Sequence, residues 1–284
     1  MRRLQEISAE RDSMQTVAEL TNVFEGLASM KIAQTKNQVL KAQEFFHEIW
    51  QIYTQLRVDE GFQFGRASGG KHLIDKELFI GVTAEGSFTG DIDQKLVNWM
   101  LSHYDPDKHD IIIIGHHGVI QLTQLGIRYK KYFKLPKSDV NINTVPLIAE
   151  IQKYKGCYLY YQTYVSLMVQ EVKRINLLAA VQEQGKSAAK SSEEISELNY
   201  IFEPSTYDVA SHLEASMLSN MLGQVIFESK LAQHASRFRA MSSAHKKADE
   251  SVDDLRLSYN RTQRGIKDER LKEIITSMRK VEVV

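Results

Sequence analysis

The last quarter of the chain, residues 207–284, contains no proline and only two glycines. Apolar or small residues recur there at steps of three and four: Leu213, Met217, Met221, Leu231, Ala235, Phe238, Met241, Ala248, Val252 and Leu255. This is the period of one helix face, held far longer than in an ordinary globular helix. About seventy helical residues reach on the order of 100 Å. Such a helix needs a partner of similar length to cover its apolar face.

The opposite end of the chain offers that partner. Residues 2–57 also lack proline and carry a single glycine, Gly26, within their own apolar stripe. Two long helices at the two ends of one chain predict an antiparallel coiled coil with a domain inserted between them. The heptads are imperfect, because Arg11 and Gln34 fall near the seam. We interpret this irregularity as a coil that shares its surface with other proteins.

The hydrophobic period changes between the two helices. Apolar runs such as 78–83 and 111–114 predict buried strands, and they alternate with short helical patterns. This alternation predicts a small, mostly parallel, Rossmann-like α/β sheet with helices on its faces. The expected division is an N-terminal coiled-coil helix at 1–57, a linker at 58–72, an α/β domain at 73–180, a polar loop at 181–205 and a C-terminal coiled-coil helix at 206–284.

Composition narrows the class of protein. The formal net charge of the 284 residues is zero, so the chain as a whole has no nucleic-acid signature. Cys157 is the only cysteine, which excludes an intramolecular disulfide and favours a reducing compartment. No apolar run approaches the roughly 18 residues of a membrane span. The N-terminus lacks the apolar core of a signal peptide and carries acids from Glu6 onward, unlike a transit peptide. We expect a cytosolic protein or a mature form.

Several residues have the chemistry of a site, but none makes a convincing one. Residues 65–71 match most of a phosphate-binding loop, yet His72 stands where Ser or Thr should hold magnesium, and no strand precedes the loop. His116 and His117 follow a predicted strand without further ligands at metal spacing. Asp91 and Asp93 are interpreted as acids at a helix start. We therefore expect no catalytic residue, no cofactor and no metal.

Charge is unevenly distributed along the chain. Residues 230–284 contain thirteen Lys and Arg against eight Asp and Glu. An acidic protein surface beside this helix and a plain solvated helix face both explain that excess.

Two motifs in the C-terminal helix resemble a known family. His234-Ala-Ser-Arg-Phe-Arg-Ala-Met-Ser-Ser-Ala244 and Leu255-Arg-Leu-Ser-Tyr-Asn-Arg261 are similar to the C-terminal signature of the gamma subunit of F-type ATP synthases. The segment 20–41 resembles the first helix of that family more loosely. The turn at 83–90 resembles the turn after the family's first strand. The order of long helix, α/β domain and long helix agrees along the whole chain.

The resemblance implies the central-stalk rotor of a rotary F-type ATP synthase or ATPase, which couples ion translocation through the membrane ring to ATP synthesis or hydrolysis. As a subunit of this ion-transporting ATPase, the rotor would make no bonds in the chemistry itself. Its terminal helices would turn inside a hexamer of alternating alpha and beta subunits. Its α/β domain would bind an epsilon-type subunit and the membrane c-ring. The expected location is peripheral, on the cytoplasmic face of a bacterial inner membrane. The partners include no nucleic acid.

The resemblance also implies contact residues. Asn260, Gln263 and Arg264 correspond to the residues that catch a loop of the beta subunit, although the order of Gln263 and Arg264 is reversed from the family's Arg-Gln. The pair of terminal helices would form the shaft of the rotor, and the surrounding subunits would form its bearing. Contacts between the two are expected at Met30, Lys31, Arg237, Arg239 and Met241.

Departures from the family pattern leave other interpretations open. The turn reads Gly86-Ser-Phe-Thr-Gly90 in place of the family's Gly-Leu-Cys-Gly-Gly, and Gly265 is a poor helix former within the C-terminal helix. These features favour a divergent branch, including an F-type-like motor used for another task. An unrelated coiled-coil adaptor and a small-molecule-binding α/β enzyme with helical arms are the further alternatives.

Overall fold

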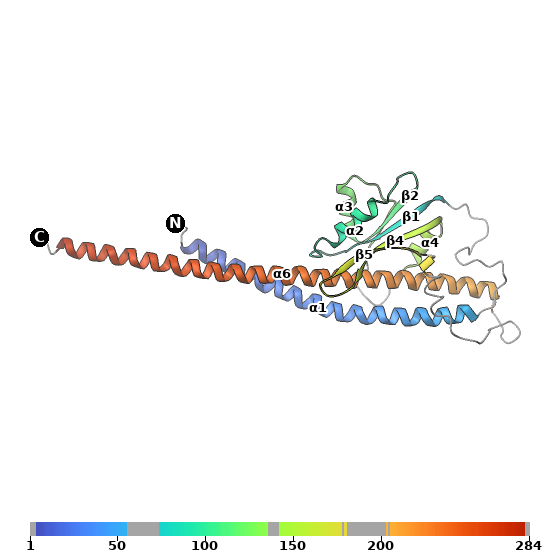
Figure 1. Cartoon of the computed structure of the whole chain (residues 1–284), viewed down its shortest axis with the longest axis horizontal. Coiled ribbons are helices and arrows are strands. Elements are labelled where there is room, and N and C mark those ends of the chain that lie inside the picture. The colour runs from blue at the N-terminus through green and yellow to red at the C-terminus, as the bar shows by residue number, and fades with distance from the viewer. Residues whose placement is uncertain are drawn as a thin grey trace. The chain divides into compact units, whose positions relative to one another are not determined.

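The structure is a computed structural model that describes residues 4–55, 74–135, 142–177, 179–180, 203 and 205–281 (Figure 1). The chain divides into two compact units, one of residues 28–237 and one that joins the first 27 residues to residues 238–284. The expected linker at 58–72, with its phosphate-loop-like stretch, lies wholly outside the described residues, as does most of the polar loop at 181–205.

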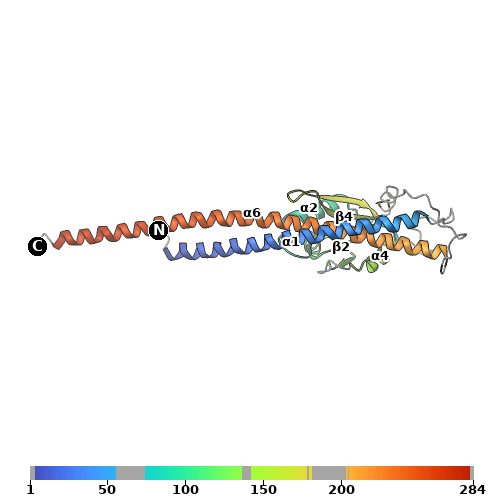
Figure 2. The ribbon, with the colours of Figure 1, turned by 90° about the horizontal axis from the view of Figure 1, so that it is seen from below.

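Two long helices begin and end the chain, as the apolar period predicts. Helix α1 spans Leu4–Gln55 and helix α6 spans Thr206–Val281. Neither contains proline, which would remove a backbone hydrogen bond and clash with the preceding turn. Within each unit the two helices run side by side in opposite directions, and both views show this (Figures 1 and 2). The predicted antiparallel pair of terminal helices is confirmed.

The larger unit also holds a five-stranded sheet. Its strands are β1 (Ile74–Val82), β2 (His109–Ile114), β3 (Lys131–Phe133), β4 (Tyr154–Tyr164) and β5 (Gln170–Asn176), in the order β3-β2-β1-β4-β5. The first four strands are parallel, and β5 pairs antiparallel with β4 through a hairpin. Three short helices connect the strands: α2 (Ile92–Leu101), α3 (His116–Gln124) and α4 (Val145–Ile151). The predicted inserted α/β domain with a mostly parallel sheet is confirmed.

Alternate side chains of the central strands enter two separate cores. On one face Phe79, Ile111 and Ile113 pack with α2 and α3. On the other face Leu78, Ile80 and Ile112 pack with α4, with Met217 and Leu222 of α6, and with Trp50 of α1. Because both faces are covered, the central strands are apolar throughout, as in other parallel sheets. The sheet is thereby anchored to the first half of α6.

Every described residue of the smaller unit is helical. Apolar residues of its part of α1 that face inward are buried, such as Ile7 and Ala18, and the guanidinium of Arg11 stacks 5.5 Å from the ring centroid of Tyr259 in α6. The last turns of α6 continue past the start of α1 (Figures 1 and 2). Their apolar side chains are exposed, including Leu271, Ile274 and Met278. No helix in the described parts of the chain is both long and apolar enough to cross a membrane.

Candidate functional site: a polar junction against the C-terminal helix

The loop between β1 and α2 crosses from the sheet to the C-terminal helix. It follows β1 at Thr83 and turns sharply, because Phe88 and Gly90 have positive φ values of 68° and 65°. Positive φ is uncommon for a residue with a side chain and marks a backbone held by its surroundings. Thr83 fixes the start of the loop: its hydroxyl donates to the carbonyl of Ile114 at 3.0 Å and accepts from the amide of Gly118 at 2.9 Å. The end of β1 and the start of α3 are thus joined.

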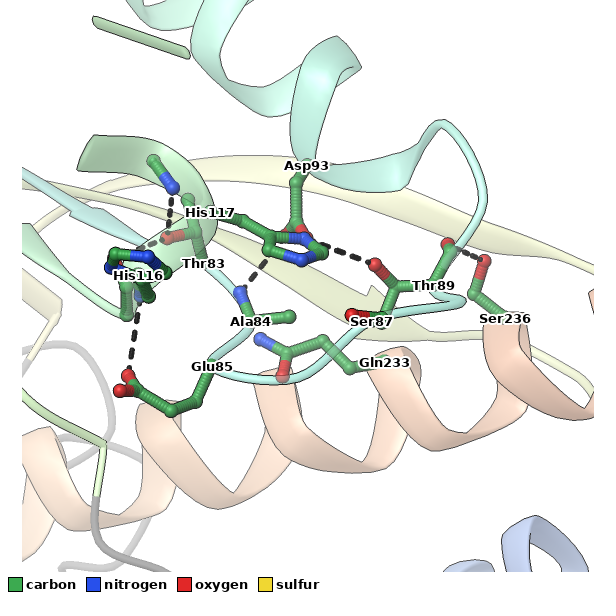
Figure 3. Close-up of polar contacts among 12 residues, drawn as sticks. Thr83, Ala84, Glu85, Ser87, Thr89, Asp93, His116, His117, Gln233 and Ser236 are labelled. Atoms are coloured by element: carbon green, nitrogen blue, oxygen red, sulfur yellow. Dashed lines mark hydrogen bonds and ion pairs between the residues drawn. The ribbon is translucent and has the colours of Figure 1, made fainter. Parts of the chain in front are cut away.

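A buried carboxylate from the following helix is enclosed by this loop. Asp93, in the first turn of α2, is only 1% exposed. Oδ1 accepts from the amide of Ala84 at 3.1 Å and from Nε2 of Gln162 in β4 at 2.8 Å, while Oδ2 accepts from the hydroxyl of Thr89 at 3.1 Å. Nδ1 of His117, in α3, lies 2.9 Å from Oδ2 (Figure 3). A buried charge requires such partners, since an uncompensated carboxylate in the interior is very costly.

The Asp93 carboxylate favours the protonated form of the His117 imidazole beside it. The hydrogen bond that His117 makes to the Asp93 carboxylate raises the pKa of His117 above the ordinary histidine value, and burial partly opposes this. The imidazole is therefore held toward its cationic form. Among the described residues, no group of three His, Cys, Asp or Glu side chains is arranged to hold a metal ion.

A second carboxylate occupies the N-terminal end of α3. Glu85 accepts from the amide of His116 at 3.2 Å, from the amide of Leu135 at 3.3 Å and from the hydroxyl of Tyr132 at 3.0 Å. In nucleotide-binding sheets, a helix N-terminus at this edge of the parallel strands binds phosphate. Here a carboxylate of the chain itself takes the position of the anion.

Helix α6 contacts the other side of the β1–α2 loop. We call these contacts, together with those among Asp93, His117 and Gln162, the polar junction. Ser236 donates to the carbonyl of Thr89 at 2.7 Å, and Nε of Arg237 donates to the carbonyl of Ser87 at 3.0 Å. Ser229 donates to Oε1 of Gln162, and Nε2 of Gln233 donates to Ser229 at 3.0 Å. Burial lowers the pKa of Arg237, whose guanidinium also lies 3.0 Å from Nδ1 of His234. The junction therefore has no evident reactive nucleophile; its contacts tie a loop to a helix.

Comparison with known proteins decides the family. The family model described as ATP synthase matches residues 3–280, nearly the whole chain. The chain belongs to the gamma-subunit family of ATP synthases. As a gamma subunit it is part of an ATPase complex associated with a membrane. An unrelated coiled-coil adaptor and an α/β enzyme with helical arms are thereby set aside.

The relatives cover the same length as this gamma subunit. It is 22% identical to the ATP synthase gamma chain of Lachnoclostridium phytofermentans, over 97% of this chain and 98% of the relative. It is 23% identical to that of Pelotomaculum thermopropionicum, over 96% of each. Among solved structures, a chain of the Euglena gracilis mitochondrial ATP synthase (OSCP/F1/c-ring) matches with a TM-score of 0.63 at 14% identity. That match covers 96% of this chain and 94% of the other, so the two share a fold.

The predicted catch residues lie on the helical unit of the gamma subunit. Asn260, Gln263 and Arg264 occupy one side of α6 at helical spacing, with Asn260 and Arg264 exposed and Gln263 half-buried. The side chains of Asn260 and Arg264 make no hydrogen bond or ion pair with any other residue that the structure describes. They are available to another protein.

The predicted bearing residues have different surroundings. Met30 is 51% exposed on α1, and Lys31 and Arg239 are half-buried. Arg237 is bound to the loop carbonyl of Ser87, and Met241 is 7% exposed. Of these residues, Met30 presents the most surface to a partner.

Sequence reasoning missed the role of Asp93. It lies in the first turn of α2 as expected, but its carboxylate is turned inward to four donors from three other elements. The available signal was that His117 follows one buried parallel strand directly and that Asp93 lies in the first turn of the helix after another. Such ends meet at one edge of a sheet.

Proposed function

We propose that this gamma subunit is the central-stalk rotor of a rotary F-type ATPase. The terminal helices turn within a hexamer of alternating alpha and beta subunits, and the α/β domain binds an epsilon-type subunit and the membrane c-ring. The observation that carries the proposal is the match of the family over residues 3–280, together with a fold shared with a chain of an ATP synthase rotor. The chain contributes contacts and no catalytic groups.

Exposed apolar side chains support an enclosing partner around the helices. On α1, the side chains of Val17, Leu20 and Leu27 are each more than 40% exposed at three- to seven-residue steps. At the end of α6, Leu271, Ile274 and Met278 are exposed in the same manner. Large exposed apolar surfaces mark sites of protein contact. A hexamer that surrounds the shaft would bury both stripes.

Coupling requires that the shaft contact the three beta subunits differently. A rotor shifts a conformational equilibrium only as far as its contacts favour one state over another. The two helices differ in sequence on every side and are uneven in length, so each orientation presents a different surface to a given beta subunit. Nucleotide affinity at the beta sites would follow the rotor's angle.

The location follows from the proposed partners. A rotor bound to a c-ring lies at the membrane surface without entering the bilayer. Because the curated relatives reported above are bacterial proteins, we place the complex on the cytoplasmic face of a bacterial inner membrane. The reversed Gln263-Arg264 order and the altered 86–90 turn also favour a second candidate, an F-type-like motor used for another task. Recovery of a c-ring with the complex would distinguish the first from the second.

Substitution of the catch tests the proposal at one contact. We expect Gln263→Ala with Arg264→Ala to slow ATP turnover of the assembled complex several-fold, because a charged contact to the beta subunit is lost. The isolated variant should keep its helix content, since both side chains project from a formed helix. Lys272→Ala, an exposed cation further along α6, is the matched control. Unchanged turnover by an intact complex would place the catch elsewhere.

A further inference from the structure

Gln162 connects Asp93 to the C-terminal helix. Its side-chain amide has two different ends, and the junction uses both: Nε2 donates to Asp93, and Oε1 accepts from Ser229 of α6. As long as Asp93 is ionised, Nε2 must face it, because a carboxylate can only accept. Oε1 is then directed at the donors of α6. The charge on Asp93 thus sets which group the sheet presents to the helix.

His117 determines how well that charge is compensated. The charged groups that act on the His117 imidazole are Asp93 of α2, Glu85 of the β1–α2 loop and Arg237 of α6. Strand β4 contributes the neutral amide of Gln162, which binds Asp93. Thr89 lies 3.5 Å from the same ring nitrogen. A protonated His117 neutralises the buried carboxylate, whereas a neutral one leaves it with hydrogen-bond donors alone. A charge-assisted hydrogen bond is about twice as strong as a neutral one.

We propose that Asp93 is a positioning residue that locks the α/β domain onto helix α6, and that His117 makes this lock tightest at mildly acidic pH. Its mechanical consequence rests on the proposed rotor function. Torque that enters through the α/β domain must pass to α6, and the junction is a polar connection between them through Ser229, Ser236 and Arg237. The apolar core would still hold the sheet on α6 if this junction loosened, but the connection would be more compliant and would transmit torque less completely.

The direction of the pH dependence follows from the partner of His117. Asp93 raises the pKa of His117 in the folded protein, so the folded state favours the imidazolium. The stabilisation is complete at pH values below the pKa of His117 in the unfolded chain, about 6.5. It is lost as the pH rises through the higher pKa of His117 in the folded protein. The lock therefore holds through mildly acidic pH and weakens on the alkaline side.

Hydrogen exchange on the full chain tests the lock directly. Amide protection of the loop 84–90, corrected for intrinsic exchange rates, is compared from pH 5.5 to 8.5. In the unaltered chain protection should fall with rising pH. Asp93→Asn keeps the shape and removes the charge; it should lower protection about tenfold and abolish the pH dependence. His117→Gln should also abolish it. Asp91→Asn, a 52% exposed acid in the same loop, should behave as the unaltered chain does.

Two measurements on the assembled complex separate the lock from the rotor function. Asp93→Asn should lower the ions pumped per ATP hydrolysed, and leave the ATPase rate of the hexamer without the c-ring unchanged because no load then acts on the α/β domain. A pH dependence of exchange that persists in His117→Gln would overturn the role of His117. Full coupling in Asp93→Asn would overturn the lock while leaving the rotor intact. Failure of the chain to join a hexamer would refute the rotor instead, and the exchange result would still stand.

Discussion

Gly115 stands where β2 turns into α3, and its backbone has a φ of +96°. A Cβ at this position would lie 2.0 Å from the carbonyl oxygen of Thr83, a distance that no structure tolerates. The close approach brings the ends of β1 and β2 together and places His117 beside Asp93. At the scale of single residues, the junction depends on this glycine as much as on its polar groups.

We expect Gly115→Ala to destabilise the larger unit by more than about 2 kcal/mol, since it combines a positive φ with a backbone clash. Gly126→Ala is the matched control: its φ is +69°, but nothing lies within 4 Å of the added carbon. Gly126→Ala should lower the free energy of unfolding by only about 1–2 kcal/mol, the cost of a left-handed backbone conformation for a residue with a Cβ. Urea unfolding followed by tryptophan fluorescence measures both, because Trp50 and Trp99 belong to the larger unit. Equal losses in the two variants would contradict this explanation.

The long helices and the strands were predictable at the scale of elements because their signals are local. Residues 207–284 carry the helical period within their own sequence. The apolar run Ile111–Ile114 predicts a strand that is buried on both faces. The junction was not predictable in this way. It joins Asp93, His117 and Gln162 with α6, and residues so far apart in the chain become neighbours only after the sheet has formed. The predicted catch and bearing contacts stay predictions.

Gly265 is an element-scale feature of the smaller unit. It lies inside α6, and an added Cβ would meet nothing within 4 Å. We expect Gly265→Ala to stabilise this part of the helix by about 0.7–1 kcal/mol, because glycine is the poorer helix former. Amide exchange of residues 260–270 in the free chain should slow by about threefold to fivefold. Gly223→Ala, also without a contact within 4 Å but in the larger unit, should leave those amides unchanged. Faster exchange in Gly265→Ala would mean that the glycine conformation is required there.

At the scale of the whole molecule, the two units have different chemistry. The larger unit is an α/β domain with two apolar cores, one of which, together with the polar junction, anchors the sheet to α6. The smaller unit is a helix pair whose outward apolar residues are left exposed by the described part of the chain. Under the proposed function, the first unit receives the torque and the second contacts the catalytic hexamer. A rotor needs both.

Rotation itself is the most direct test of that account. Cys157 is the only cysteine and its thiol is buried. Gln124→Cys, at an exposed position of α3, would therefore supply one reactive thiol to which a bead can be attached as a probe of rotation. With the alpha and beta subunits fixed to a surface, ATP should drive the bead in one direction, with three pauses per turn for the three beta sites. A bead that stays still while the hexamer hydrolyses ATP at its full rate would contradict the central claim.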